Sequence, residues 1–364
     1  MASTFEAVRY GVIGTGMMGV EHIRNLNALP GAEVTAVADP HRPSIDAALA
    51  ALPAPHAVAT FVDHRDLLAS GTCDALVIAT PNMTHIDVLH DALATDLHVL
   101  VEKPLCTTVA DCKTVAKMAE DRSAITWVGL EYRYMAPAAR LVDEVRAGTV
   151  GDLRMLSIRE HRFPFLEKVG DWNRFNRNTG GTLVEKCCHF FDLMCLVVGE
   201  RPVAVVASGG QDVNHLDERY GGERPDILDN AYVIVEFPRG VRALLDLCMF
   251  AEATKNQEEL VAVGDKGKVE ALIPEGIVRI GRRGKHWIGR VDEETATDER
   301  AAHEGFHHGS SYLEHLDFLD AIRSGGAAKV TVDDGLWSVA IGVAAHRSID
   351  ESRRVELDEV MADG

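Results

Sequence analysis

A glycine-rich turn near the start of the chain limits the fold more than any other feature. Residues 8–13 (VRYGVI) form a short apolar run typical of a buried strand, and the GTGMMG segment that follows places Gly14, Gly16 and Gly19 at the spacing G-x-G-x-x-G. Apolar residues then recur at helical spacing as far as Leu29. A strand, a glycine turn and a helix in this order indicate the first unit of a dinucleotide-binding sheet.

Each glycine of this turn has a physical task in such a unit. Gly14 permits a tight turn, Gly16 lets the backbone approach a pyrophosphate, and Gly19 lets the helix pack closely on the strand. The next strand, EVTAVAD, ends at Asp39. A carboxylate there accepts hydrogen bonds from ribose hydroxyls and repels a 2′-phosphate, so the sequence predicts NAD rather than NADP. Arg42 is the one nearby residue that could tolerate the phosphate, and a glycine turn without a cofactor is the alternative.

The strand–helix alternation continues and brings polar side chains to strand ends. Residues 73–80 and 97–104 are two further apolar strands, with a helical pattern from His85 to Ala94 between them. Ligands of open parallel sheets bind at the carboxyl ends of the strands. We therefore expect Lys103, which lies at such an end, to be functional rather than only a solvated lysine.

After Gly129 the pattern changes to consecutive strands. β-branched runs with partial alternation predict strands at residues 152–163, 202–209, 230–237, 241–250 and 257–264. Short turns after Phe237 and after Gly264 favour antiparallel pairing. We expect two domains, 1–130 and 131–364, with a closing helix at about 333–350.

The segment from Gly180 to Met194 gathers ionisable residues in an apolar run. LVEKCCHFFDLMCLVV predicts one buried helix of about four turns. Glu185, His189 and Asp192 would then share one face with Cys188. Burial of such groups is costly unless they are paired.

Four interpretations of this face compete. A zinc site needs Cys and His, but adjacent cysteines point about 100° apart on a helix and no Cys-x-x-Cys accompanies them. A disulfide between Cys187 and Cys188 would demand strained geometry. A satisfied core histidine and a catalytic face remain. We favour the catalytic face, with the cysteines as small packing residues and no bound metal.

The overall charge and composition exclude other classes of protein. The chain has 364 residues with 46% hydrophobic residues and a formal net charge of -19, which argues against nucleic acid or an anionic membrane as the main partner. No apolar run approaches the ~20 residues of a membrane span, and the first residues lack a signal-peptide pattern. Seven cysteines favour reduced thiols. We expect a cytoplasmic protein.

Together, these segments resemble one enzyme family. The glycine motif, ATPN at 79–82, EKP at 102–104 and EYRY at 131–134 come in the order and spacing of the Gfo/Idh/MocA oxidoreductases. GGTLVEKCCHFFD is similar to that family's catalytic G-G-x-x-x-[D/E]-x-x-x-H-x-x-D helix, where many members carry Asp in place of Glu185. VTVDDGLWSVAIGVAAHRS resembles the closing helix.

The resemblance implies a fold and a substrate class. It implies an α/β protein with an N-terminal Rossmann domain, a doubly wound parallel sheet, followed by a C-terminal α/β domain on an open, largely antiparallel sheet. Nicotinamide would lie between the domains, substrates would be sugars or cyclitols, and homodimers or homotetramers would form through the C-terminal sheet.

The motifs and the resemblance together assign the site residues. The catalytic residues are expected to be Lys103, His189 and Glu185. Cofactor contacts are expected from Gly14, Thr15, Gly16, Met17, Met18, Asp39, Thr80, Asn82, His85, Glu102, Lys103 and Arg133. The segment 161–181 is rich in Arg, Asn and Trp, which suit a polyol. Substrate contacts are expected from Asp192, Tyr132, Trp172, Arg174, Asn176 and His307.

The predicted function is NAD-dependent oxidation of a secondary hydroxyl of a sugar, glycoside or cyclitol. His189 is the expected general base and Lys103 the donor to the reacting oxygen, although either could take the proton. One alternative is a glycosidase that acts through a transient 3-keto intermediate and recycles NAD. Another is a non-catalytic NAD-binding sensor.

Overall fold

The chain forms two compact units in the computed structural model, which describes residues 7–363. The first unit comprises the described residues up to Glu131, together with Lys168–Trp172 and Arg300–Leu336. The second comprises Tyr132–Glu167, Asn173–Glu299 and the described residues from Trp337 onward. The domain boundary at residues 130 and 131 remains a prediction from the sequence.

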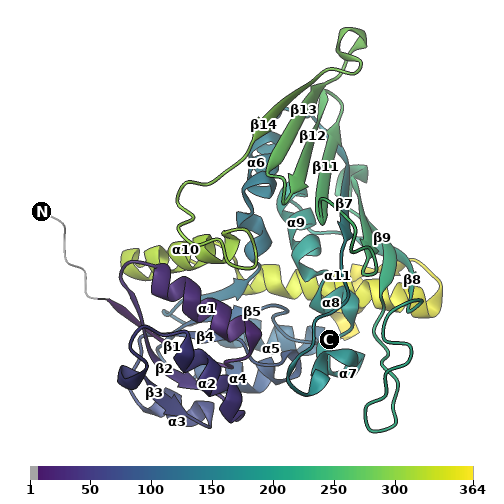
Figure 1. The fold of residues 1–364 in the computed structure, drawn as a ribbon. Helices are drawn as coiled ribbons and strands as arrows, with labels where there is room; N and C mark the ends of the chain where they lie inside the picture. Colours follow the sequence, from purple (N-terminus) through teal and green to yellow (C-terminus); the bar gives the residue numbers. More distant parts are fainter. Residues whose placement is uncertain (1–6, 364) are drawn as a thin grey trace, which may run out of the picture. The chain divides into compact units, whose positions relative to one another are not determined.

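A six-stranded parallel sheet is the centre of the first unit (purple and blue in Figure 1). The strands lie in the order β3-β2-β1-β4-β5-β6, so the order reverses between β1 and β4. In sheets of this class a ligand binds at that reversal, beyond the carboxyl ends of the strands. The strands are β1 (Val8–Ile13), β2 (Ala32–Ala38), β3 (Ala59–Phe61), β4 (Ala75–Ile78), β5 (His98–Glu102) and β6 (Thr126–Gly129).

Helices connect these strands, as parallel pairing requires. Two of them begin at a side-chain cap: Asp63 accepts from the N–H of Arg65, and Thr108 accepts from the N–H of Asp111. The helices are α1 (Met17–Ala28), α2 (Arg42–Ala50), α3 (His64–Ala69), α4 (His85–Leu93), α5 (Val109–Ala119) and α10 (Ser310–Ser324). Short 3₁₀ turns are η1 (Pro55–Ala57), η2 (Asn82–Thr84) and η3 (Glu131–Tyr134).

A nine-stranded sheet forms the second unit, in the order β14-β13-β12-β11-β7-β10-β9-β8-β15. Strands β7 and β10 pair in parallel, and the other neighbours in this order pair antiparallel. This confirms the expected α/β class with a second, largely antiparallel sheet. The strands are β7 (Leu153–His161), β8 (Ala204–Gly210), β9 (Asn230–Glu236), β10 (Arg242–Cys248), β11 (Glu258–Gly264), β12 (Gly267–Ile273), β13 (Ile277–Arg282), β14 (Val291–Thr295) and β15 (Val355–Glu356).

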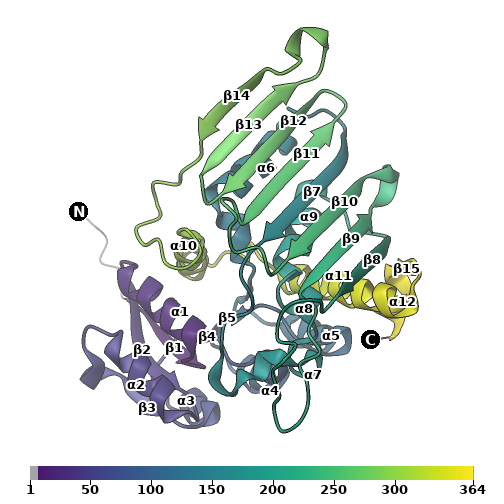
Figure 2. The same ribbon diagram turned by 45° about the vertical axis from the view of Figure 1, so that its right-hand side comes forward.

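The two faces of the second sheet differ. Helices α6 (Ala136–Arg146) and α9 (Cys188–Val198) pack against one face, which they cover from behind in Figure 2. Residues that alternate toward this face, such as Val233, Leu245 and Leu260, are buried. Met155, Tyr232 and Ile234 alternate the other way and are exposed. The remaining helical segments are η4 (Val169–Arg174), α7 (Asn176–Thr179), α8 (Thr182–Glu185), η5 (Pro238–Gly240), η6 (Lys285–Trp287), α11 (Val332–Glu351) and α12 (Leu357–Asp363).

Two expectations from the sequence need correction. The single helix predicted from Leu183 to Val198 is two helices, α8 and α9, which separate at Lys186 and Cys187. At this break the thiol of Cys188 donates to the carbonyl oxygen of Glu185 (3.4 Å), so a side chain competes for a backbone acceptor. The sheet also has four strands, β12–β15, that the sequence analysis missed. β14 (VDEET) is exposed throughout and therefore shows no apolar alternation.

Among residues 7–363, no helix combines the length and the apolar composition that a bilayer crossing requires.

Candidate active site

The glycine turn joins β1 to α1 with unequal space around its three glycines. Gly14 has a positive φ of 86°, and a Cβ there would lie 2.6 Å from the Ala79 carbonyl. A Cβ on Gly19 would lie 2.0 Å from the Gly14 oxygen. A Cβ on Gly16 would meet no described atom within 4 Å. Gly14 and Gly19 are therefore required by the fold, whereas Gly16 leaves open space at the start of α1.

That open space suits the diphosphate of a dinucleotide. Gly16 precedes α1, and no side chain caps this end of the helix. The first N–H groups of a helix and its dipole together attract anions. Asn82, after β4, adds a buried side-chain nitrogen for which the described residues offer no hydrogen-bond acceptor. These donors fit an NAD molecule at the carboxyl ends of β1 and β4.

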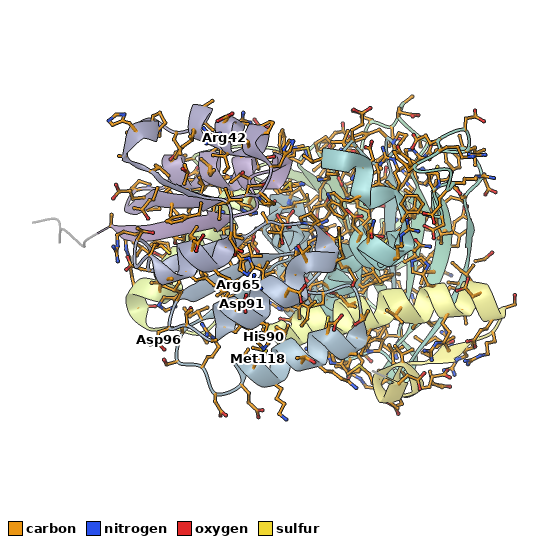
Figure 3. All side chains as sticks on the ribbon, turned by 90° about the horizontal axis from the view of Figure 1, so that it is seen from below. Arg42, Arg65, His90, Asp91, Asp96 and Met118 are labelled. Atoms are coloured by element: carbon orange, nitrogen blue, oxygen red, sulfur yellow. The ribbon has the colours of Figure 1, made fainter. Side chains whose placement is uncertain are left out.

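Asp39 lies directly after β2 and is held by backbone donors. Its carboxylate accepts from the N–H of Thr15 (2.7 Å) and from the N–H of His41 (2.7 Å). Arg42, the residue that could have tolerated a 2′-phosphate, pairs instead with Asp46 (2.9 Å) on the outside of α2, where Figure 3 labels it. Arg42 thus has another partner, and the ribose contact of Asp39 remains a prediction.

Glu102 and Lys103 follow β5, with a buried chain of side chains behind them. The Glu102 carboxylate accepts from the N–H of Lys103 (3.0 Å) and contacts His22 Nε2 (2.9 Å). His22 Nδ1 in turn lies 2.8 Å from His315 Nε2 of α10. Burial by itself would raise the pKa of Glu102, but the His22 hydrogen bond and the charges of His22 and Lys103 hold that pKa below its ordinary range. The carboxylate is thus kept ionised beside Lys103.

The ionised Glu102 carboxylate determines which ring nitrogen of His22 must carry a proton. His22 Nε2 must carry a proton to donate to Glu102. Burial, followed by the neighbouring His22, lowers the pKa of His315 well below its ordinary value, so His315 is neutral. The sequence analysis missed both histidines, because neither lies in a motif and they are far apart in the chain.

His85 and His307 occupy supporting positions in the first unit. The two ring nitrogens of His85 lie 2.8 Å from the Pro104 oxygen and 3.1 Å from the Thr80 oxygen. His85 therefore links the segments that follow β4 and β5. His307 lies 3.3 Å from the buried Glu131 carboxylate. Their predicted cofactor and substrate contacts remain predictions.

The second unit holds His189 against an aromatic ring. The His189 imidazole, near the start of α9, is buried and stacks on the Tyr132 ring at 4.0 Å between centroids and 8° between planes. Phe190 meets the same ring edge-on at 5.7 Å. Near-parallel stacking on Tyr132 holds the plane of the imidazole.

Asp192 and Arg133 form a buried ion pair in this unit. Arg133 donates from Nε to Asp192 Oδ2 (2.5 Å) and from a second nitrogen to Oδ1, a two-point contact. Arg133 was predicted to contact cofactor and Asp192 to contact substrate. The pair ties these two residues to each other, and neither predicted contact is tested by this geometry.

Arg174 and Asn176 contact the long polar loop before β9. Arg174 is buried and donates to Glu218 (3.1 Å) and to Asn173 (3.1 Å). The Asn176 side chain donates to the Asp226 carbonyl oxygen (2.9 Å). Both residues therefore fix a loop in place. Trp172 falls in the first unit by its contacts, and its substrate role remains a prediction.

Comparison with known protein families identifies the class of protein to which this chain belongs. A domain model described as an oxidoreductase family NAD-binding Rossmann fold matches residues 8–130, and one described as an oxidoreductase family C-terminal alpha/beta domain matches residues 142–357. The protein is therefore an NAD-dependent oxidoreductase whose first unit is an NAD-binding Rossmann domain. Both models are those of the Gfo/Idh/MocA oxidoreductases, and the chain belongs to that family.

Relatives and solved structures cover nearly the full length. The chain is similar to myo-inositol 2-dehydrogenase from Thermotoga maritima, with 26% identity over 97% of this chain and 100% of that one. It is similar to 2,7-anhydro-N-acetylneuraminate hydratase from Escherichia coli, with 25% identity over 80% and 76%. Levoglucosan dehydrogenase, solved with NADH and levoglucosan, shares the fold with a TM-score of 0.83 at 20% identity, over 97% of this chain and 100% of that one.

Proposed function

We propose that the protein oxidises a secondary hydroxyl of a sugar, glycoside or cyclitol, with NAD as the hydride acceptor. The observation that carries this proposal is the buried His189, held flat on Tyr132 within an NAD-dependent oxidoreductase. The likeness to myo-inositol 2-dehydrogenase supports a polyol as the substrate class.

The residues have complementary roles in this proposal. His189 removes the hydroxyl proton, because a neutral imidazole is a base near neutral pH. Lys103 donates a hydrogen bond to the reacting oxygen and stabilises its developing negative charge. Glu185, at the end of α8, favours the charged form of His189. Bound NAD supplies the acceptor for the hydride.

Binding contacts complete the proposal. We assign the diphosphate to the turn of Gly14, Thr15 and Gly16 with Met17 and Met18, and the adenosine ribose to Asp39. Further cofactor contacts come from Thr80, Asn82, His85, Glu102 and Arg133. Hydroxyls of the substrate meet Asp192, Tyr132, Trp172, Arg174, Asn176 and His307.

Assembly and location belong to the same proposal. The exposed face of the second sheet carries Val206, Ile234 and Leu244 side by side in register on β8, β9 and β10. An apolar row of this kind favours association through the sheet, as a homodimer or a homotetramer. We place the enzyme in the cytoplasm, where a diffusible NAD pool is available.

A second candidate is a redox-assisted lyase or glycosidase that recycles NAD. The likeness to a family member named a hydratase favours keeping it. Oxidation next to a C–H acidifies that C–H and permits elimination, and the later return of the hydride leaves no net NADH.

One screen separates the candidates. Purified protein is incubated with NAD and a panel of inositols, free sugars and glycosides, while NADH absorbance and products are followed. A keto product with equimolar NADH is expected. Glycoside cleavage without net NADH would support the second candidate, and NAD binding without turnover of any compound would support a sensor.

A further inference from the structure

A buried cluster of charged residues lies behind the His189 and Tyr132 stack. Glu160 on β7 and Glu258 on β11 are directly opposite each other in the antiparallel pairing of these strands. Both are buried, on the face that α9 covers. Two facing carboxylates repel each other, so this position needs a cation.

Lys186 supplies that cation from the break between α8 and α9. Its ammonium lies 2.9 Å from Glu160 Oε1 and is buried with it. Arg162, just after β7, lies 3.3 Å from the same oxygen. Burial, and then the facing Glu160 carboxylate, raises the pKa of Glu258, so Glu258 is largely protonated at the acidic side of neutrality. Burial lowers the pKa of Lys186, and the Glu160 carboxylate opposes this shift. With Lys186 and Arg162 charged, the cluster carries one negative and two positive charges.

The ammonium also connects this cluster to the proposed base. Lys186 Nζ donates to the Tyr132 hydroxyl (2.7 Å), and the face of the Tyr132 ring carries the His189 imidazole. The hydroxyl lies on the long axis of the Tyr132 ring, so this hydrogen bond fixes the position of the outer end of the side chain. Phe190, packed edge-on, and the stacked His189 restrict its rotation about that axis.

We propose that Lys186 and Glu160 are positioning residues for His189, acting through the Tyr132 ring. Glu160 forms an ion pair with the Lys186 ammonium, and the ammonium donates a hydrogen bond to the Tyr132 hydroxyl. The Tyr132 ring in turn stacks on His189 and sets the plane of the imidazole. This inference rests on the proposed function, in which His189 is the general base.

The ammonium has a second effect on the imidazole, through its charge. A nearby positive charge disfavours a second one, so Lys186 keeps His189 in its neutral, basic form. Among the described residues, the titratable groups on the elements that pack near His189 include Tyr132, which stacks on it, Glu185, Asp192 with Arg133, the Glu160 cluster, and His346 of α11, which contacts Leu183. His346 accepts from the N–H of Leu183 (3.1 Å), and burial lowers its pKa to about 4, so it stays neutral.

Two variants separate position from charge. Lys186→Met removes the bond to Tyr132 and one positive charge, so it should lower kcat about tenfold and raise the His189 pKa by about half a unit or more. Lys186→Met combined with Glu160→Gln removes one charge of each sign. The double variant should keep the low kcat, while the His189 pKa returns toward its original value.

Tyr132 is tested by a matched pair. Tyr132→Phe keeps the stacked ring and loses only the hydroxyl, so kcat should fall a fewfold. Tyr132→Leu removes the stack, and its kcat should fall further. Lys266→Met, at an exposed lysine in the turn between β11 and β12, is the charge control and should change neither kcat nor the His189 pKa.

The effect of the Lys186 charge can be measured without substrate. The His189 pKa is read by NMR of histidine-labelled protein with NAD bound, and His189→Gln identifies the signal. Thermal unfolding checks that each variant is folded. An unchanged His189 pKa in folded Lys186→Met, with an unchanged kcat, would overturn the inference. Near-full kcat in His189→Ala would instead overturn the proposed function, so the two failures are distinguishable.

Discussion

The two units hold their functional groups by different means. In the first unit, the carboxylates of Asp39 and Glu102 accept from the main-chain N–H groups of Thr15 and Lys103, and Glu102 adds one side-chain partner, His22. In the second unit, the partners of His189 and Asp192 are side chains, the Tyr132 ring and the Arg133 guanidinium. A main-chain donor is fixed by the sheet itself, whereas a side-chain partner is fixed only as well as its own neighbours hold it. Function in the second unit should therefore be more sensitive to residues that touch no ligand.

The largest loss of activity is expected when the proposed catalytic residue of either unit, Lys103 or His189, is replaced. Lys103→Ala and His189→Ala should each lower kcat by about 10²-fold or more, as loss of an acid–base or charge-stabilising group does. NAD affinity, measured by NADH fluorescence titration, should change little. If either variant keeps near-full kcat, the replaced residue has a structural role only. The unit that contains it then does not supply the catalytic group assigned to it.

The glycine turn tests how strictly the backbone of the first unit is fixed. Gly14→Ala and Gly19→Ala place a Cβ against backbone atoms, so the melting temperature should fall by several degrees. Gly16→Ala meets open space and should leave the melting temperature unchanged, while NAD affinity falls about tenfold because the backbone no longer admits the diphosphate. Calorimetry gives both quantities. Equal melting temperatures in all three variants would contradict the steric argument.

The contribution of Glu102 to the stability of the first unit should depend on pH. The folded-state pKa of Glu102 is depressed, so its ionic contribution to stability is present above its ordinary pKa of about 4.3 and is lost as the pH falls below that value. Glu102→Gln should cost about 3 kcal/mol at pH 7, because it breaks a buried pair with His22. That cost should shrink on acidification below pH 4.3.

Thermal unfolding of the wild type and Glu102→Gln between pH 7 and pH 3.5 checks this prediction. Glu33→Gln, at an exposed position of β2, is the control and should cost little at any pH. A cost for Glu102→Gln that stays constant with pH would show that the charge is not what stabilises the site.

The smallest effect is expected from Asp39. Asp39→Ala removes the repulsion of a 2′-phosphate, so the preference for NAD over NADP in kcat/KM should fall by about tenfold. Asp39→Asn is the matched variant: it removes the charge but keeps one side-chain oxygen that can accept from Thr15 or from His41, so the preference should fall by a similar factor. Equal or better use of NADP by the unmodified protein would refute the assignment of Asp39.

Local patterns predicted much of the first unit. The predicted strands coincide with β1, β2, β4 and β5 to within two residues, because a buried parallel strand is a continuous apolar run with turn residues at its ends. The glycine spacing predicted the turn between the first strand and the first helix, because all the residues that shape this turn lie within one short segment.

The second unit was harder to predict in its details. β14 lacks any apolar pattern, and the break at Lys186 replaced one predicted helix by two. The sequence did contain one unused signal. A lysine within the apolar run LVEKCCHFF must find a partner when it is buried, and Glu160 falls in phase with the inward-facing Leu156 and Ile158 of β7.

The amino-acid sequence by itself determined the class of the protein: a Rossmann domain with a glycine turn, an acidic residue, Asp39, at the end of the second strand, and a lysine and a histidine at motif positions. Those features depend on neighbours within one turn, one strand or one helix. Only the tertiary structure decided which side chains support them. His22 meets His315, 293 residues away along the chain, and Lys186 meets Tyr132 and Glu160 from two other elements. The physical reason is that burial forces each polar group to find a partner in space, and the fold alone sets which distant residues are within reach.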